Sequence, residues 1–223
     1  MPQTHHYKLV SFELCPFVER SRIALTEKGL AYELELIDLR HKPDWFLAVS
    51  PMGKVPVLLV DDQPIFESLV INELIEELHP EPRLFPADPL ERAAARAWMI
   101  FANDQLMPAA YQAQLALAVE RPQDAEKPLA NVRAAFGKLE EELVKRKRQF
   151  FVGDTFGLVD TVYASFFRRW KVSEEWGGAR LLHAFPALAA YADALLAHPS
   201  VVQVAIADLG PKMREALREH ASK

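Results

Sequence analysis

The chain of 223 residues has one cysteine, Cys15, and it has neither a long apolar run nor an excess of basic residues. One thiol cannot form an internal disulfide, which argues for a reducing compartment. No stretch reaches about 18 consecutive apolar residues and no secretory signal opens the chain, so we expect a cytoplasmic protein without a membrane segment. The net charge of −5 argues against nucleic acid as a partner, because such binders usually carry a clustered basic face.

Two local features could be taken for binding sites. The basic run "KRKR" over residues 145–148 ends a helical pattern that begins near Lys127. Cations stabilise the C-terminal end of a helix, so we interpret this run as a solvated helix end. His5 and His6 form a pair near the N-terminus. We assign them no metal, and we expect no metal site.

The first eighty residues alternate between strand and helix periodicity, which predicts an α/β domain. The expected order is βαβαββα, a small mixed sheet with helices packed on it. The predicted strands cover residues 7–12, 31–39 and two runs within 55–68 around a turn at 61–64, and the predicted helices cover residues 16–29, 42–51 and 68–80.

A proline-rich segment separates this domain from the rest of the chain. Four prolines fall within "PEPRLFPADP", where they discourage both helix and strand. We therefore predict a domain over residues 1–80, a linker over 81–89 and an all-α helical-bundle domain over 90–223. Helix breaks are expected near Pro122, Gly153 to Gly157, Gly177 to Gly178, Pro186, Pro199 and Pro211.

The single cysteine follows the first predicted strand and stands directly before Pro16, a residue favoured at the first position of a helix. At a helix N-terminus, free backbone N–H groups and the helix dipole favour a thiolate over a thiol. The alternative is a small buried apolar side chain, as most free cysteines are. The C-x-x-C redox motif would need a second cysteine in place of Val18, so any second thiol must come from solution. Cytosolic glutathione is the obvious supplier.

Glutathione is an extended tripeptide with two carboxylates and one ammonium, and three stretches offer groups that suit it. A cis Val55–Pro56 bond would leave the Val55 backbone free to pair with a peptide, although a trans proline opening an edge strand is the simpler reading. Ser68 and Glu67 could hold a carboxylate and an ammonium, although Ser68 could simply cap a helix. Lys42 could pair with the other carboxylate or be merely solvated.

Taken together and in this order, these motifs resemble the glutathione transferase superfamily, and most of all its omega class and related cysteine-type branches. The motifs that carry the resemblance are Cys15-Pro16-Phe17, Lys42-Pro43-Asp44-Trp45-Phe46, Val55-Pro56 and Glu67-Ser68.

The resemblance implies a thioredoxin-like N-terminal domain, a cis Val55–Pro56 bond, glutathione as cosubstrate and a homodimer. It also implies that Cys15 is the nucleophile and forms a mixed disulfide with glutathione. The glutathione contacts that it implies are Phe17 beside the bound thiol, Lys42 at the glycyl carboxylate, the Val55 backbone at the cysteinyl unit, and Glu67 with Ser68 at the γ-glutamyl end.

The second domain contains "VGDTFGLVD", which resembles the buried helix start of the same family. The usual serine or threonine cap is replaced by Gly157, while Asp160 is retained. Only half of the reciprocal capping box is therefore expected, with Asp160 accepting from the backbone at the cap.

The function predicted from these observations is glutathione-dependent thiol transfer on a small electrophilic or disulfide substrate. Dehydroascorbate reduction, deglutathionylation and release of glutathione from aryl adducts all use this chemistry. Two alternatives stay open: conjugation or isomerisation with a bound glutathione thiolate, and a non-enzymatic binding role like that of intracellular chloride-channel proteins or bacterial stringent-starvation regulators. The substrate is expected between the Cys15 turn and the second domain. Met107, Tyr111, Gln114, Phe166 and Trp170 could line it there, or they could simply belong to the core or the surface.

Overall fold

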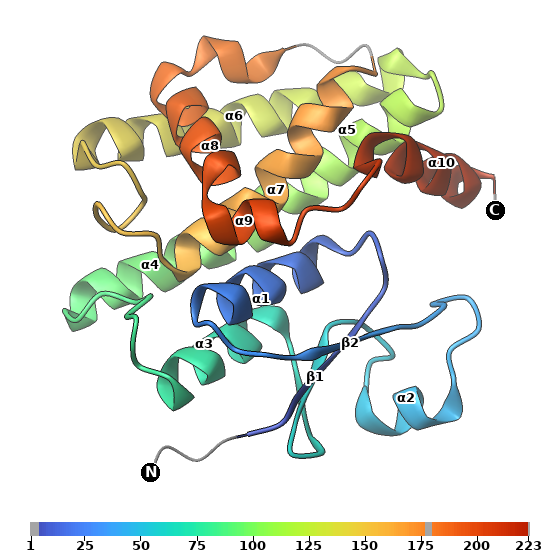
Figure 1. The fold of residues 1–223 in the computed structure, drawn as a ribbon. Coiled ribbons are helices and arrows are strands. Elements are labelled where there is room, and N and C mark those ends of the chain that lie inside the picture. Colours follow the sequence, from blue (N-terminus) through green and yellow to red (C-terminus); the bar gives the residue numbers. More distant parts are fainter. Residues whose placement is uncertain (1–4, 177–179, 223) are drawn as a thin grey trace. The chain divides into compact units, whose positions relative to one another are not determined.

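A computed structural model describes residues 5–176 and 180–222, and the chain divides into two compact units, Met1–Leu84 and Phe85–Lys223. The first unit has the element order βαβαββα, so the predicted order is confirmed (Figure 1). Its elements are β1 (Tyr7–Ser11), α1 (Pro16–Glu27), β2 (Glu33–Leu36), α2 (Asp44–Val49), β3 (Val57–Val60), β4 (Gln63–Phe66) and α3 (Ser68–Leu78).

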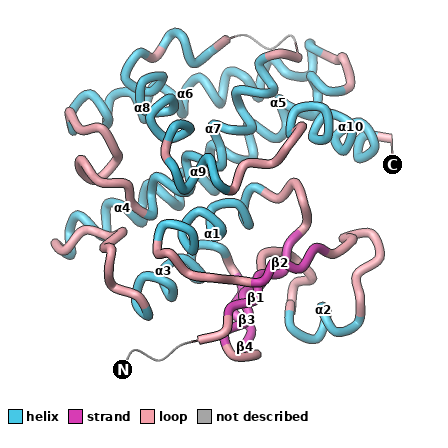
Figure 2. Tube along the Cα trace, viewed as in Figure 1, coloured by secondary structure: helices cyan, strands magenta, loops and turns pink. Residues whose placement is uncertain are grey.

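The four strands form one mixed sheet in the order β2-β1-β3-β4, and Figure 2 shows them side by side. β1 pairs with β2 in parallel, and β3 is antiparallel to both of its neighbours. The β3–β4 hairpin turns at Asp61 and Asp62, whose φ angles are 49° and 69°. The turn is shorter than the predicted 61–64, because Gln63 already pairs with Val60.

Successive side chains along each strand point to opposite faces of the sheet, and helices cover both faces. Tyr7 and Leu9 of β1 point to the face that α1 and α3 cover, whereas Val10 packs against Phe46 of α2 on the other face. The buried members of the larger cluster are Tyr7, Leu9, Cys15, Val18, Leu25, Leu58, Val60, Ile71 and Ile75. α1 and α3 therefore share one face of the sheet.

α1 has the expected termini. Pro16 is its first residue, where a missing N–H leaves no helical bond unmade. Lys28 is its C-cap and Gly29 follows with φ 67°, while the Leu30 N–H donates to the Leu25 carbonyl. This is the left-handed glycine ending common to helices.

In the described residues of the second unit, all regular secondary structure is helical, as predicted. Its elements are α4 (Pro89–Phe101), a π-helical segment (Ala102–Leu106), α5 (Met107–Ala118), α6 (Pro122–Arg146), α7 (Leu158–Glu174), a 3-10 turn (Leu181–Ala184), α8 (Pro186–Ala197), α9 (Pro199–Gln203) and α10 (Leu209–Ala221).

One predicted helix boundary in this unit is wrong: α6 begins at Pro122 instead of near Lys127, and it continues through Pro128. The break expected near Pro211 is present, because α9 ends at Gln203 and α10 begins at Leu209, with Pro211 in its first turn. The break expected at Gly177 to Gly178 lies outside the described residues.

The start of α7 is organised by one buried carboxylate. Asp160 Oδ2 accepts from the Gly157 N–H at 2.8 Å, which confirms the predicted half of the capping box. Its Oδ1 accepts from the Phe151 N–H at 3.0 Å and from the Tyr191 hydroxyl at 2.6 Å. Burial raises the pKa of Asp160 from 3.8 to about 6, against the lowering effect of these hydrogen bonds.

The basic run is a helix end, as predicted. Lys145 and Arg146 lie in the last turn of α6, and Lys147 caps the helix with φ 51°. None of the helices in residues 5–176 and 180–222 has the length and apolar content needed to cross a membrane.

Candidate glutathione site in the first unit

The backbone holds Cys15 at the N-cap of α1. Its N–H donates to the Phe12 carbonyl at 3.1 Å, and its own carbonyl accepts from the Glu19 N–H at 3.2 Å. The φ and ψ angles of Cys15 are −70° and 118°, the extended conformation usual for a cap. The predicted strand–turn–helix placement of the thiol is therefore present.

The Cys15 sulfur faces the loop that precedes β3. Sγ lies 4.0 Å from the Val55 carbonyl oxygen, and the residue is 7% exposed. Phe17 and Val55 are half-buried and pack against the same core cluster as Cys15. The thiol thus lies at the margin of the core, next to a backbone segment predicted to bind a peptide.

The Val55–Pro56 bond is cis, as the resemblance implies and contrary to the simpler reading. β3 begins one residue later at Val57. Val55 itself lies outside the strand ladder, since the pairs of β3 begin at Val57.

Glu67, and not Ser68, is the N-cap of α3, so the prediction that Ser68 caps the helix is wrong. β4 continues to Phe66, and Glu67 reverses the chain with φ 70° and ψ 111°. Ser68 is consequently the first helical residue, and it is 4% exposed. The Glu67 side chain is exposed.

Lys42 is exposed and lies before α2, yet its ammonium approaches the Val55 loop. A Cβ added at Gly53 would lie 3.3 Å from Lys42 Nζ. Gly53 has φ 57°, a conformation that favours glycine. Sequence reasoning missed Gly53, although the turn-forming "SPMG" before Lys54 was a usable signal.

Strand register explains why these scattered residues gather. Val10 near the end of β1 pairs with Val57 at the start of β3, and Val57 also pairs with Phe66 at the end of β4. Ser11 pairs with Leu36, which ends β2. The ends of β1, β2 and β4 and the start of β3 therefore lie at the same end of the sheet. The loops that carry Cys15, Lys42, Val55 and Glu67 all leave or enter the sheet there.

The side chains named as conceivable substrate contacts are divided by burial. The buried ones are Gln114, Phe166 and Trp170, and the Phe166 and Trp170 rings stack at 6.0 Å. Gln114 donates to the Ser173 hydroxyl and to the Arg169 carbonyl. Tyr111, by contrast, is 39% exposed, and burial raises its pKa. Three of the five thus serve the core of the second unit.

Two family models match the chain. The model described as "Glutathione S-transferase, N-terminal domain" matches residues 9–83, and "Glutathione S-transferase, C-terminal domain" matches residues 122–194. A "Probable glutathione S-transferase" of Glycine max is 36% identical over 201 residues, which are 88% of this chain and 87% of the relative. "Glutathione S-transferase omega-1" of Rattus norvegicus is 31% identical over 168 residues, 75% of this chain and 68% of the relative.

Solved structures of two classes are similar along almost the whole chain. The Tau class glutathione S-transferase of mango, Mangifera indica, has a TM-score of 0.85 at 29% identity and covers 96% of this chain and 97% of its own. Glutathione transferase Omega 3C of Trametes versicolor has a TM-score of 0.81 at 29% identity, and the similarity covers 100% of this chain and 94% of that protein's chain. Sequence, fold and both domain models agree, and the chain belongs to the glutathione transferase superfamily.

Proposed function

We propose that the protein is a glutathione-dependent thiol transferase that works through a mixed disulfide between Cys15 and glutathione. The observation that carries the proposal is the position of the Cys15 sulfur. It lies at the N-terminal end of α1 and 4.0 Å from the Val55 carbonyl oxygen. This is also the end of the sheet at which α3 begins.

The surrounding groups suit each part of glutathione. In this proposal the Val55 backbone pairs with the cysteinyl unit as an added strand would, and Phe17 lies beside the bound thiol. The N–H groups at the start of α3, with the Ser68 hydroxyl, hold the γ-glutamyl carboxylate, and Glu67 accepts from the ammonium. Lys42 pairs with the glycyl carboxylate.

The first chemical step is attack by the Cys15 thiolate on the glutathione sulfur of a mixed disulfide, R–S–S–G. The new bond joins the Cys15 sulfur to the glutathione sulfur, and the S–S bond of the mixed disulfide breaks. Its electron pair leaves with R–S⁻, a thiolate that takes a proton from water. The helix N-terminus favours the attacking anion.

In the second step the thiolate of another glutathione attacks the glutathione sulfur held by Cys15. Oxidised glutathione leaves, and Cys15 returns as a thiolate. The net reaction converts one mixed disulfide and one glutathione into a free thiol and oxidised glutathione. No second protein cysteine is needed, which fits a chain that has only one.

Two assays test the proposal on wild type and Cys15→Ala: glutathione-dependent reduction of hydroxyethyl disulfide and conjugation of chlorodinitrobenzene. We expect the reduction to be present in wild type and to fall at least a hundredfold in Cys15→Ala. Conjugation that survives in Cys15→Ala, without any reductase activity in wild type, would favour the conjugating alternative. If wild type shows neither activity, a non-enzymatic binding role would be favoured.

Ser11→Ala is a matched control for the same assays. Ser11 supplies the nearest hydroxyl in the sequence to Cys15, but it is buried and donates to the Phe12 carbonyl at 2.9 Å. We expect Ser11→Ala to keep disulfide reduction within about threefold of wild type. A large loss would point instead to hydroxyl activation of glutathione.

The homodimer and the cytoplasmic location that the resemblance implies stay predictions. Sedimentation equilibrium of the purified protein tests the first. A mass near twice 25.3 kDa is the expected result.

A further inference from the structure

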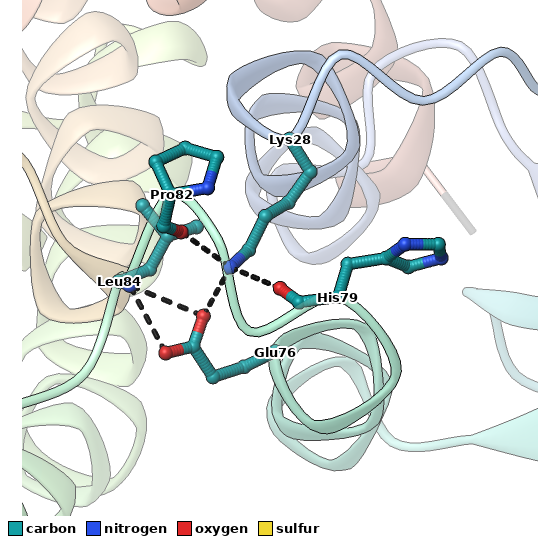
Figure 3. Close-up of polar contacts among 5 residues, drawn as sticks. All are labelled: Lys28, Glu76, His79, Pro82 and Leu84. Atoms are coloured by element: carbon teal, nitrogen blue, oxygen red, sulfur yellow. Dashed lines mark hydrogen bonds and ion pairs between the residues drawn. The ribbon is translucent and has the colours of Figure 1, made fainter. Parts of the chain in front are cut away.

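The C-terminal ends of α1 and α3 meet at one buried ammonium, that of Lys28 (Figure 3). The Lys28 side chain is 0% exposed. Its Nζ donates to Glu76 Oε2, to the His79 carbonyl and to the Pro82 carbonyl, each at 2.5 Å. An ammonium has three donors, so the network uses them all.

The partners of Lys28 are tied to the rest of the unit in turn. Both carboxylate oxygens of Glu76 accept from the Leu84 N–H, at 3.0 and 3.1 Å (Figure 3). The His79 ring is hydrogen-bonded to the Tyr7 hydroxyl of β1 at 2.7 Å. Lys28 therefore holds α1 both to the last turn of α3 and to the segment that follows it.

A buried ion pair is weak evidence of stability, because removing two charges from water offsets much of their attraction. Its geometric effect is more specific. Lys28 joins the end of α1 to acceptors on the last turn of α3 and on the segment after it. Farther along the two helices, the Asn72 amide donates to the Arg20 carbonyl at 3.4 Å.

The opposite ends of the same two helices carry the proposed site. α1 begins just after Cys15, and α3 begins at Ser68 directly after Glu67. The helices are 12 and 11 residues long, so each is a rod of roughly 17 Å. A shift or tilt where Lys28 joins them would change the separation of their N-terminal ends.

We propose that Lys28 is a positioning residue for glutathione: it fixes α1 against α3 and thereby sets the distance from Cys15 to Glu67 and Ser68. The inference rests on the proposed function, because it requires a ligand that contacts both helices. A reagent that meets only the Cys15 sulfur does not depend on that distance. Glutathione, which reaches both N-termini, does.

The test uses Cys15→Ser as the parent, so that glutathione binds without a covalent step. Calorimetric titration of glutathione into the parent and into its Lys28→Met version gives the two dissociation constants. We expect the constant to rise about tenfold, which corresponds to about 1.4 kcal/mol of binding free energy. With Cys15 intact, the rate of alkylation by iodoacetamide should change less than about twofold in Lys28→Met.

Two further variants make the comparison specific. Glu76→Gln keeps an acceptor for the Leu84 N–H but removes the charge facing Lys28, and it should raise the dissociation constant in the same direction. It also decides the question if Lys28→Met does not fold. Lys8→Met is the matched control, because the Lys8–Glu35 pair at 2.5 Å joins β1 to β2 and touches neither helix. Its dissociation constant should equal that of the parent.

Unchanged glutathione binding in both Lys28→Met and Glu76→Gln would overturn the positioning role. So would an equal loss of binding and of alkylation, since that pattern indicates general damage. A parent that binds glutathione while wild type lacks thiol transfer would refute only the proposed function. A parent that does not bind glutathione would refute both proposals.

Discussion

The Cys15 thiol is the residue on which the chemistry depends, and its ionisation can be measured directly. The N-terminal end of α1 favours the anion, so Cys15 should alkylate with iodoacetamide at half its maximal rate well below pH 8.5, near which a free cysteine ionises. The rate of modification across pH 4 to 9 gives the midpoint. A midpoint at or above 8.5 would contradict the thiolate.

Glu67 combines an exposed carboxylate with a strained backbone, and the two can be separated by substitution. Its φ of 70° is unfavourable for any side chain, at a cost of about 1–3 kcal/mol. Glu67→Gly should therefore keep or raise the free energy of unfolding, by up to about 2 kcal/mol after glycine's own entropy cost. Glu67→Gln should leave it unchanged. Urea unfolding measures both.

Both Glu67 variants remove the proposed partner of the glutathione ammonium. Their dissociation constants for glutathione should rise together, by about tenfold. A Glu67→Gly protein that lost stability but bound glutathione normally would show that the Glu67 side chain serves folding and not the ligand.

At this scale the sequence motifs indicated most of the candidate site. Cys15, Phe17 and Val55 could be predicted because short local sequence patterns mark the turn before α1 and the cis proline. Lys28 and Gly53 were missed, since their roles depend on partners distant in the chain or in another loop. Ser68 was assigned the wrong helix position because the length of β4 is set by pairing with β3.

Among the elements, α7 offers a test of stability through Asp160. Asp160→Asn leaves three donors facing one amide, so the amide N–H₂ must meet at least one of them. Each unsatisfied buried donor costs about 1–3 kcal/mol. We therefore expect the free energy of unfolding to fall by about 2–4 kcal/mol at pH 7.

The same variant has a pH signature. The pKa of folded Asp160 is raised from 3.8 to about 6, so the folded state binds a proton at a higher pH than the unfolded chain. This contribution to stability is complete below about pH 4 and is lost as pH rises through 6; it amounts to about 3 kcal/mol. The stability gap between wild type and Asp160→Asn should widen as pH falls from 7 to 4. A constant gap would contradict the raised pKa.

The elements themselves were largely readable from periodicity. Strand alternation and helical spacing gave the order βαβαββα, because one face of each element is buried in a common core. The breaks expected near Pro122 and Pro211 are present, and each proline occupies the first turn of the helix that follows. The helix expected to begin near Lys127 instead begins at Pro122 and tolerates Pro128, because the packing of the whole helix outweighs one missing hydrogen bond.

For the whole molecule, glutathione should act as a stabilising ligand. A ligand that binds only the folded state at 100 times its dissociation constant adds about 2.7 kcal/mol to the free energy of unfolding. For a chain of this size the unfolding midpoint should then rise by about 5–10 °C. Differential scanning calorimetry of Cys15→Ser with and without glutathione measures the shift. Lys42→Met, which removes the proposed partner of one carboxylate, should reduce it, and an equal shift in both proteins would argue against that partner.

Because the chain of 223 residues has one sulfhydryl group, oxidation can form a disulfide at one position only. Any covalent tether through sulfur, whether to a second copy or to a foreign protein, has to occupy Cys15 itself. On the proposed mechanism, molecules cross-linked through Cys15 are inactive. A reductant that breaks the cross-link would restore their turnover at the same time.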